Sequence, residues 1–336
     1  MGDTHDYNQS TPPQPAEVKW RRARVFMRIL GLRGAWALAT LLFTSILVFS
    51  ATQLMPGNVA ELMLGQFASD EAISALEVKL GLDRPAIVQF GDWLGGLLTG
   101  DFGVSPRMSA PIGPLLWQHL QMSLLLAGSS LVLVFLIGVT LGTLAALNRG
   151  NLLDRSIASI SLLGISVPEF VSGCFLILVF TGILPISGYA PTDAGLWEWL
   201  SHLILPVASL TFLMLAHVVR TARVSMVEAL SEPYVRTAVL KGLPRRIVVL
   251  KHALRNALLP TVTVLGINVG YLIGGVVVIE IVFSYPGLGR LTVFAVQNRD
   301  IPLIQACTLT MAAIYITASF LTDAIYLYLN PRLRTG

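Results

Sequence analysis

The stretch that decides the fold is Leu120–Leu147, LQMSLLLAGSSLVLVFLIGVTLGTLAAL, which contains no charged residue. A helix needs about 20 apolar residues to cross a hydrocarbon layer of ~30 Å, so this run can span a membrane. Five further apolar runs lie before and after it, at Gly34–Leu54, Ser156–Ile183, Leu200–Val219, Asn256–Ile279 and Ile301–Thr322. The sequence therefore predicts an all-α polytopic membrane protein with six transmembrane helices.

The composition excludes a soluble domain. Of the 336 residues, 54% are hydrophobic and 12% are charged, whereas soluble domains have roughly 25% charged residues. The net charge of +4 does not indicate a nucleic-acid partner, because most Lys and Arg residues lie between the apolar runs. The two cysteines, Cys174 and Cys307, lie inside apolar runs, so we expect small buried side chains without a disulfide.

The distribution of Lys and Arg predicts the orientation of the chain. Basic residues are frequent in the segments 19–33, 149–155, 220–255 and 332–334, and sparse in the alternate connections. Because positively charged flanks stay in the cytoplasm, both termini are expected to be cytoplasmic.

These assignments divide the chain into segments. The apolar run after Lys19 exceeds the length of a signal-peptide core, so we expect an uncleaved first helix, and the first seventeen residues read as a disordered tail. Two short helices are expected between the first two spans, from Asp70 to Gly81 and from Pro85 to Gly100. The predicted parts are a cytoplasmic tail (1–33), the first transmembrane helix (34–54), an external subdomain (55–119), a membrane core (120–329) that contains a cytoplasmic loop (220–256), and a cytoplasmic C-terminal tail (330–336).

The loop between the fourth and fifth spans predicts a short helix outside the bilayer. Ser231 is a suitable N-cap, Pro233 fits the first turn, and Gly242 suits a C-terminal cap with positive φ. The expected helix covers about Glu232 to Lys241, and Pro244 prevents its continuation. An interfacial helix whose basic side chains contact lipid phosphates is the alternative interpretation.

The same loop resembles a known family motif. The segments Tyr234–Gly242 (YVRTAVLKG) and His252–Pro260 (HALRNALLP) are similar to the cytoplasmic EAA loop of ABC importer permeases, in the form found in the dipeptide and oligopeptide (peptide/nickel) transporter family. Arg236 stands where the general motif has its leading Glu. Further segments resemble the first (B-type) of the two permeases in such systems: Leu80–Pro85, Trp93–Gly103, Ser166–Phe170, Val282–Leu291 and Asn330–Arg332.

The resemblance implies a function and a set of partners. Such permeases pair with a sister permease to form a path through the bacterial cytoplasmic (inner) membrane for di- or oligopeptides or a related small solute. Two cytoplasmic ABC ATPase subunits supply energy, and an external substrate-binding protein delivers the solute. The EAA loop docks on an ATPase as a coupling helix, which assigns ATPase coupling to Tyr234, Arg236, Thr237, Ala238, Lys241 and Gly242.

The sequence predicts neither an enzyme nor a resident cofactor. It contains no G-x-x-x-x-G-K-[ST] phosphate loop, so ATP and Mg are expected on the partner subunits. The histidines lack ligand spacing such as H-x-x-x-H, so no metal site is expected.

A turn after the fifth span is a candidate external gate. Pro286, Gly287 and Gly289 have special backbone needs, and the apolar Phe283 and Leu288 flank them. The segment either re-enters the path and occludes it or is an ordinary external loop.

Three carboxylates lie at or near membrane depth, where ionisable groups are functional candidates. Glu169 either lines the path or forms a buried pair with Arg or His. Glu280 either anchors the gate or is solvated at the interface, and Asp323 is expected to pair with Arg332 or Arg334.

Two other classes of protein compete with the importer. A secondary transporter or channel subunit would use these carboxylates as proton or ion sites, and inverted repeats would favour it, but none is visible. A membrane-embedded enzyme would need a paired nucleophile and base or a metal cluster, and neither is evident.

Overall fold

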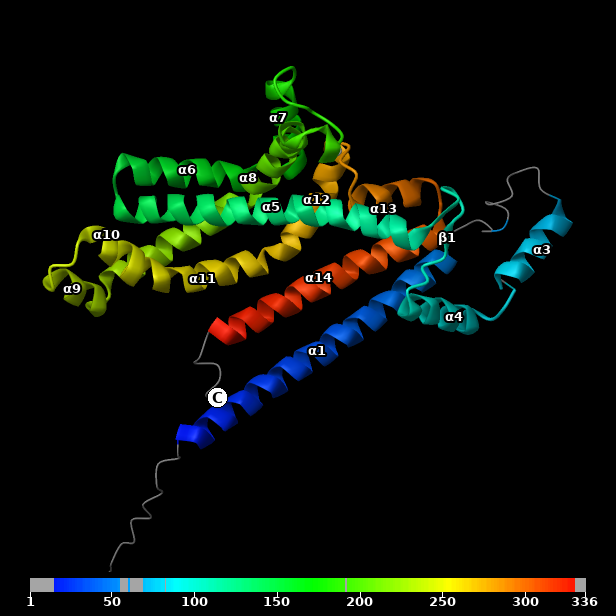
Figure 1. Cartoon of the computed structure of the whole chain (residues 1–336), viewed down its shortest axis with the longest axis horizontal. Coiled ribbons are helices and arrows are strands. Elements are labelled where there is room, and N and C mark those ends of the chain that lie inside the picture. Colours follow the sequence, from blue (N-terminus) through cyan, green and yellow to red (C-terminus); the bar gives the residue numbers. More distant parts are fainter. Residues whose placement is uncertain (1–14, 55–59, 61–68, 82, 191, 330–336) are drawn as a thin grey trace, which may run out of the picture.

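The computed structural model describes residues 15–54, 60, 69–81, 83–190 and 192–329. Its helices form one elongated bundle, in which α5 (Ile112–Leu147), α6 (Leu152–Ser166) and α8 (Leu196–Ser231) run along the length of the molecule (Figure 1). Two short helices, α9 (Pro233–Leu240) and α10 (Arg245–Ile247), lie at one end, which we call the α9 end. The opposite end carries the strand β1 and is called the β1 end.

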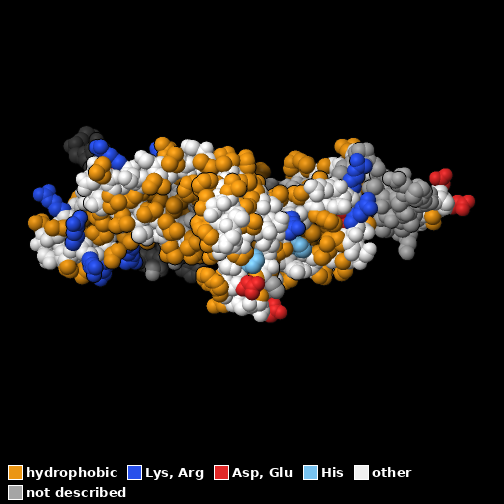
Figure 2. Space-filling view, turned by 90° about the horizontal axis from the view of Figure 1, so that it is seen from above, with side chains coloured by type: hydrophobic (Ala, Val, Ile, Leu, Met, Phe, Trp, Pro, Cys, Tyr) orange, Lys and Arg blue, Asp and Glu red, His pale blue; other side chains and the backbone are white. Residues whose placement is uncertain are grey.

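The predicted fold class is confirmed. Among the described residues, five helices are long and apolar enough to cross a membrane, and a bent pair of helices raises this number to six. On the face seen in Figure 2, orange apolar side chains are spread along the middle of the bundle, and blue Lys and Arg side chains are most frequent at the α9 end. This distribution suits a body whose middle lies in lipid.

The first helix is longer than the predicted span. Helix α1 covers Pro15–Gln53, and its apolar part is Met27–Gln53. The chain is therefore helical from Pro15, inside the predicted disordered tail, whose first fourteen residues lie outside the described part. Helix α1 lies along α14 (Ile301–Leu329). Toward the N-terminus of α1, both helices lie farther from the rest of the bundle (Figure 1).

The fourth span is also longer than predicted. Helix α8 continues to Ser231, twelve residues beyond the predicted end at Val219, and tolerates Pro206 in its interior. The predicted loop 220–256 therefore begins inside this helix. Residues after Val219 stay helical because they pack on α5 and on the segments of the α9 end. A hydropathy pattern along the sequence does not show these tertiary contacts.

Two glycines bring α5 and α8 close together. A Cβ atom on Gly138 would lie 2.6 Å from Val218 Cγ1, and one on Gly142 would lie 2.5 Å from Ala222 Cβ. The glycines are four residues apart, so they share a face of α5 and form a small-residue contact typical of membrane helices.

Two predicted spans are broken. The third consists of α6 and α7 (Glu169–Phe180), which meet at 105° where Pro168 interrupts the helix. The fifth, predicted as one run from Asn256 to Ile279, consists of α11 (Leu254–Ile267) and α12 (Val269–Val282).

The β1 end contains the two short helices expected there. Helix α3 (Asp70–Leu80) ends at Gly81 with φ +69°, and α4 (Ala86–Thr99) ends at Gly100 with φ +84°. A short antiparallel hairpin follows, formed by β1 (Val104–Ser105) and β2 (Ala110–Pro111).

A buried carboxylate fixes this hairpin to the bundle. Asp300 accepts hydrogen bonds from Ser105 Oγ (2.5 Å) and from the backbone N–H of Leu303 in the first turn of α14 (3.2 Å). Nearby, Gln305 Nε2 donates to Thr52 Oγ1 at 2.6 Å and joins α14 to the end of α1.

The two cysteines differ in their surroundings. Cys307 is buried, as expected, whereas Cys174 is exposed on the surface of α7. The expectation of a buried Cys174 is therefore wrong, because an apolar run in a membrane helix also supplies the side chains that face outward.

Candidate functional site

The first candidate site is α9, a helix of eight residues with sharply defined ends. Pro233 occupies its first turn, and the predicted C-terminal cap Gly242 has φ +74°. The predicted N-cap is wrong: Ser231 still belongs to α8, where its Oγ donates to the carbonyls of Val227 (3.2 Å) and Glu228 (2.7 Å). Glu232 takes the N-cap position without a side-chain hydrogen bond.

One face of α9 packs on the bundle. Val235 and Ala238 are buried in an apolar cluster with Met226 of α8 and Val248 of the π-helical segment η2 (Val248–Ala253). Tyr234 is also bonded to α11, because Asn256 Nδ2 donates to its hydroxyl at 2.8 Å. Ala238, which the resemblance assigned to ATPase coupling, therefore faces the protein interior.

The other face of α9 is exposed and partly apolar. Arg236, Thr237 and Lys241 are exposed, as a contact surface requires. Val239 and Leu240 are exposed as well, and Leu240 retains 80% of its accessible surface. Sequence reasoning missed these two residues, which lie one and two positions after the buried Ala238.

The second candidate site is the turn between α12 and α13 (Leu288–Gln297). Phe283 and Tyr285 in this turn are fully buried, and Ser284 between them has φ +50°. The Gly188 N–H, in the connection between α7 and α8, donates to the Phe283 carbonyl at 2.8 Å. The turn is therefore a packed part of the bundle and not an open loop.

Glu280 holds this turn from inside. Its side chain has no accessible surface, and its carboxylate accepts hydrogen bonds from the N–H groups of Gly289 (2.7 Å) and Arg290 (3.1 Å). Ser123 Oγ of α5 also donates to Glu280 and accepts from the Leu288 N–H at 2.8 Å. Solvation of Glu280 at the interface is therefore wrong, and the carboxylate anchors the start of α13.

Gly287 makes room for this carboxylate. Its φ of −98° is open to any residue, so the backbone does not require glycine. A Cβ atom at this position would instead overlap the Glu280 carboxylate, and one on Gly289 would lie 2.7 Å from Val277 Cα. Pro286 precedes the crowded position, and Leu288 follows it as a buried side chain.

Two further carboxylates differ from the expectation in their partners. Within the described residues, no hydrogen bond or ion pair reaches the carboxylate of Glu169, which begins α7 and is partly exposed, so the expected buried pair is wrong. Asp323 forms an ion pair with Arg33 of α1. Its expected partners, Arg332 and Arg334, lie outside the described residues.

Together these features define an all-α membrane protein with a partly apolar helix exposed at one end and a buried turn farther along the bundle. Residues 138–335 match the family model of the binding-protein-dependent transport system inner membrane component, and residues 26–118 match the model of its N-terminal part. The chain belongs to this family of ABC importer permeases.

Similar proteins agree with this assignment. The probable peptide ABC transporter permease protein y4tP of Sinorhizobium fredii (strain NGR234) is 39% identical over 300 residues, which are 88% of this chain and 96% of that protein. The glutathione transport system permease protein GsiC of Escherichia coli (strain K12) is 39% identical over 311 residues, covering 92% and 98%.

A solved structure supports the fold. The inward-facing MetNI methionine ABC transporter superposes with a TM-score of 0.52 at 19% identity, covering 64% of this chain and 96% of that chain.

Proposed function

We propose that this chain is the permease subunit of an ATP-driven importer for di- or oligopeptides or a closely related small solute. The names of its relatives, a peptide permease and a glutathione permease, support this class of solute. Both matches extend over nearly the whole length of those proteins, so the likeness includes the helices that would line a path.

The proposal includes three kinds of partner. A sister permease completes the path, two ABC ATPases bind ATP and Mg on the cytoplasmic side, and a binding protein delivers the solute from outside. The family description, a binding-protein-dependent inner membrane component, supports the last of these. The concentration of Lys and Arg at the α9 end supports a cytoplasmic position for that end and for both termini.

The outer face of α9 is the proposed docking surface for an ATPase. The observation that carries this assignment is the exposure of Val239 and Leu240 on a helix whose opposite face is fixed to three other elements. Apolar side chains next to the exposed Arg236 are the composition of an interface centre. Tyr234 and Gly242 set the position and the exit of the helix, because one bonds α11 and the other ends the helix.

The buried turn is the proposed gate. Glu280 and Ser123 hold the start of α13 against α5, so α13 moves only when these hydrogen bonds break or when α5 moves with it. A displacement of α9 by ATP-driven closure of the ATPases would reach this turn through α8 and α5 together, because α8 contacts α12 while Ser123 of α5 holds the start of α13.

Co-purification tests the docking surface. The tagged chain is expressed with its sister permease and ATPases, and the ATPases retained after detergent extraction are measured. We expect Arg236→Glu and Val239→Asp to lose the ATPases, and Tyr234→Ala to weaken their retention because α9 loses its bond to Asn256.

Val78→Asp is the matched control, since Val78 is an exposed apolar residue of α3 at the other end. Full ATPase retention and full uptake in all three α9 variants would contradict the docking assignment and favour an interfacial helix. Uptake of labelled dialanine or glutathione without ATP would instead favour a secondary transporter or channel.

A further inference from the structure

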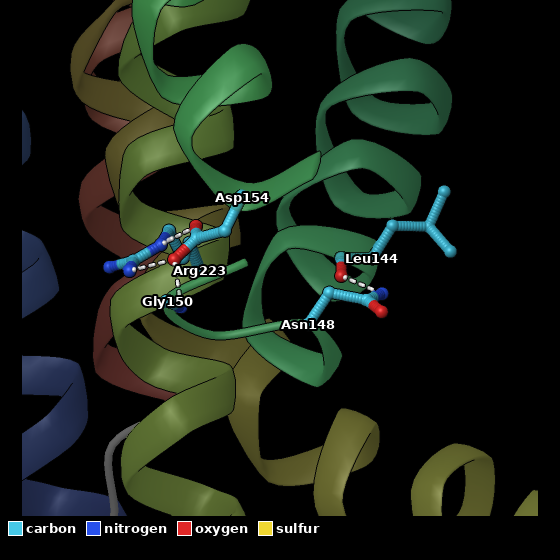
Figure 3. A network of polar contacts seen from close by, with 5 residues as sticks. All are labelled: Leu144, Asn148, Gly150, Asp154 and Arg223. Atoms are coloured by element: carbon cyan, nitrogen blue, oxygen red, sulfur yellow. Dashed lines mark hydrogen bonds and ion pairs between the residues drawn. The ribbon is translucent and has the colours of Figure 1, made fainter. Parts of the chain in front are cut away.

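An ion pair at the corner between α5 and α6 is outside both sites described above. Arg223 of α8 donates from Nε to Asp154 Oδ1 (2.5 Å) and from Nη2 to Asp154 Oδ2 (2.7 Å), as Figure 3 shows. The Gly150 N–H donates to the same Oδ2 at 2.9 Å. Parallel bonds of this kind fix distance and orientation together.

The Asp154 side of this pair is buried and the Arg223 side is not: the Arg223 side chain retains 31% of its accessible surface. Asp154 is 4% exposed, whereas both partners are substantially exposed in Arg33–Asp323 and Arg84–Asp92. The buried Asp154 carboxylate accepts three hydrogen bonds, so moving it breaks all three at once and costs free energy even though water can still reach part of Arg223.

The location of the pair connects it to both proposed sites. Asp154 lies in the first turn of α6, and Arg223 lies in the last part of α8, which passes directly into α9. Beside it, Gly142 lets α5 approach Ala222 of α8 closely. Just beyond the break between α6 and α7, Gly173 of α7 packs on the gate turn: a Cβ atom there would lie 3.3 Å from Phe283.

We propose that Asp154 and Arg223 are positioning residues that lock the α5–α6 corner to α8, so that a displacement of α9 reaches the gate turn as a rigid-body movement. The inference rests on the proposed function of α9 and of the turn. Without the lock, α8 follows α9 while α5 and α6 lag behind. The ATPases then remain bound and hydrolyse ATP, but the gate does not respond.

The test follows the gate without using a solute. Cysteine is introduced at Ser284 in a Cys174→Ser, Cys307→Ala background, and the complete transporter is reconstituted in lipid nanodiscs. The labelling rate with a water-soluble maleimide is measured without nucleotide and after trapping with ATP and vanadate. We expect trapping to change this rate in the parent protein, and Asp154→Asn to reduce the change about tenfold.

Further variants separate positioning from simple damage. Arg223→Lys keeps the charge but not the paired bonds, so an intermediate response is expected. Asp154→Asn combined with Arg223→Gln also removes the charge that the single variant leaves unpaired. We expect the gate response to stay lost in this double variant, because the paired hydrogen bonds are still missing. Asp92→Asn, which removes an exposed carboxylate from a single 3.3 Å contact, is the matched control and retains the full response.

The outcomes distinguish the inference from the function on which it rests. Equal ATPase retention and ATPase rates in Asp154→Asn and Asp92→Asn, with loss of the gate response only in Asp154→Asn, support the lock. A full gate response in Asp154→Asn overturns the lock and leaves the docking of α9 intact. An unchanged labelling rate on trapping the parent protein overturns both the gate assignment and the lock.

Discussion

Helix α9 and the turn after α12 are both short, but α9 is only partly buried, whereas the turn is almost completely buried. Helix α9 fixes one face to the bundle and leaves Val239 and Leu240 exposed. In the turn, Phe283, Tyr285 and Leu288 are all buried, and Glu280 satisfies the first N–H groups of the next helix from within the same chain.

This difference indicates what each element binds. A surface that binds another protein leaves apolar side chains exposed in the free subunit, because burying them on binding provides the free energy of association. An element whose hydrogen bonds and packing are already complete gains nothing from a permanent partner. Substitutions in the turn should therefore act inside the subunit, whereas those on the outer face of α9 should act between subunits.

The largest effect is expected from Gly287→Ala. The new Cβ overlaps the Glu280 carboxylate, so the bonds to Gly289 and Ser123 are broken or the turn shifts, at a cost of about 3 kcal/mol. The melting temperature of the purified complex should fall and uptake should be lost. Gly274→Ala, in open space on α12, is the control; equal behaviour of the two variants would show that the turn is not crowded as described.

Leu240→Asp should separate the two regions most clearly. It places a charge at the centre of the proposed contact and should weaken ATPase binding by about 2 kcal/mol, while the subunit itself keeps its melting temperature. The measurement is the ATPase concentration needed to restore hydrolysis to the stripped permease pair. A normal requirement for ATPase would mean that this face of α9 is not the docking surface.

Gly242→Ala should have a smaller effect of about 1 kcal/mol. At φ +74° an alanine is strained, so the end of α9 shifts, whereas Gly242→Asn should be milder because Asn tolerates this conformation. Uptake per ATP hydrolysed reports the change. If Ala and Asn reduce this ratio equally, backbone strain is not the cause of the reduction. Gly91→Ala is the control for adding a methyl group, because Gly91 has open space around it and its φ is not positive.

The smallest effect is expected from Arg33→Gln. The Arg33–Asp323 pair joins α1 to α14, but its side chains are 37% and 40% exposed, so the pair should contribute less than about 1 kcal/mol. We expect uptake and melting temperature close to those of the parent protein. A loss comparable to that of Gly287→Ala would place α1 among the elements that control the gate.

The sequence by itself determined the fold class and the local elements. Long uncharged runs require membrane-spanning helices, because the lipid offers no hydrogen-bond partners to the backbone. Pro168 breaks the third span, Pro233 and Gly242 bound α9, and Gly81 and Gly100 end the short helices. Each of these features depends on neighbours within a few residues, which a sequence displays directly.

Only the tertiary structure decided the contacts between distant segments. Glu280 binds Ser123, 157 residues away, and Asp154 binds Arg223, 69 residues away. The extension of α8 to Ser231 and the inward position of Ala238 likewise depend on packing against other elements. The sequence supplied these donors, acceptors and apolar faces, but which of them meet is fixed by how the helices pack, and no local pattern encodes it.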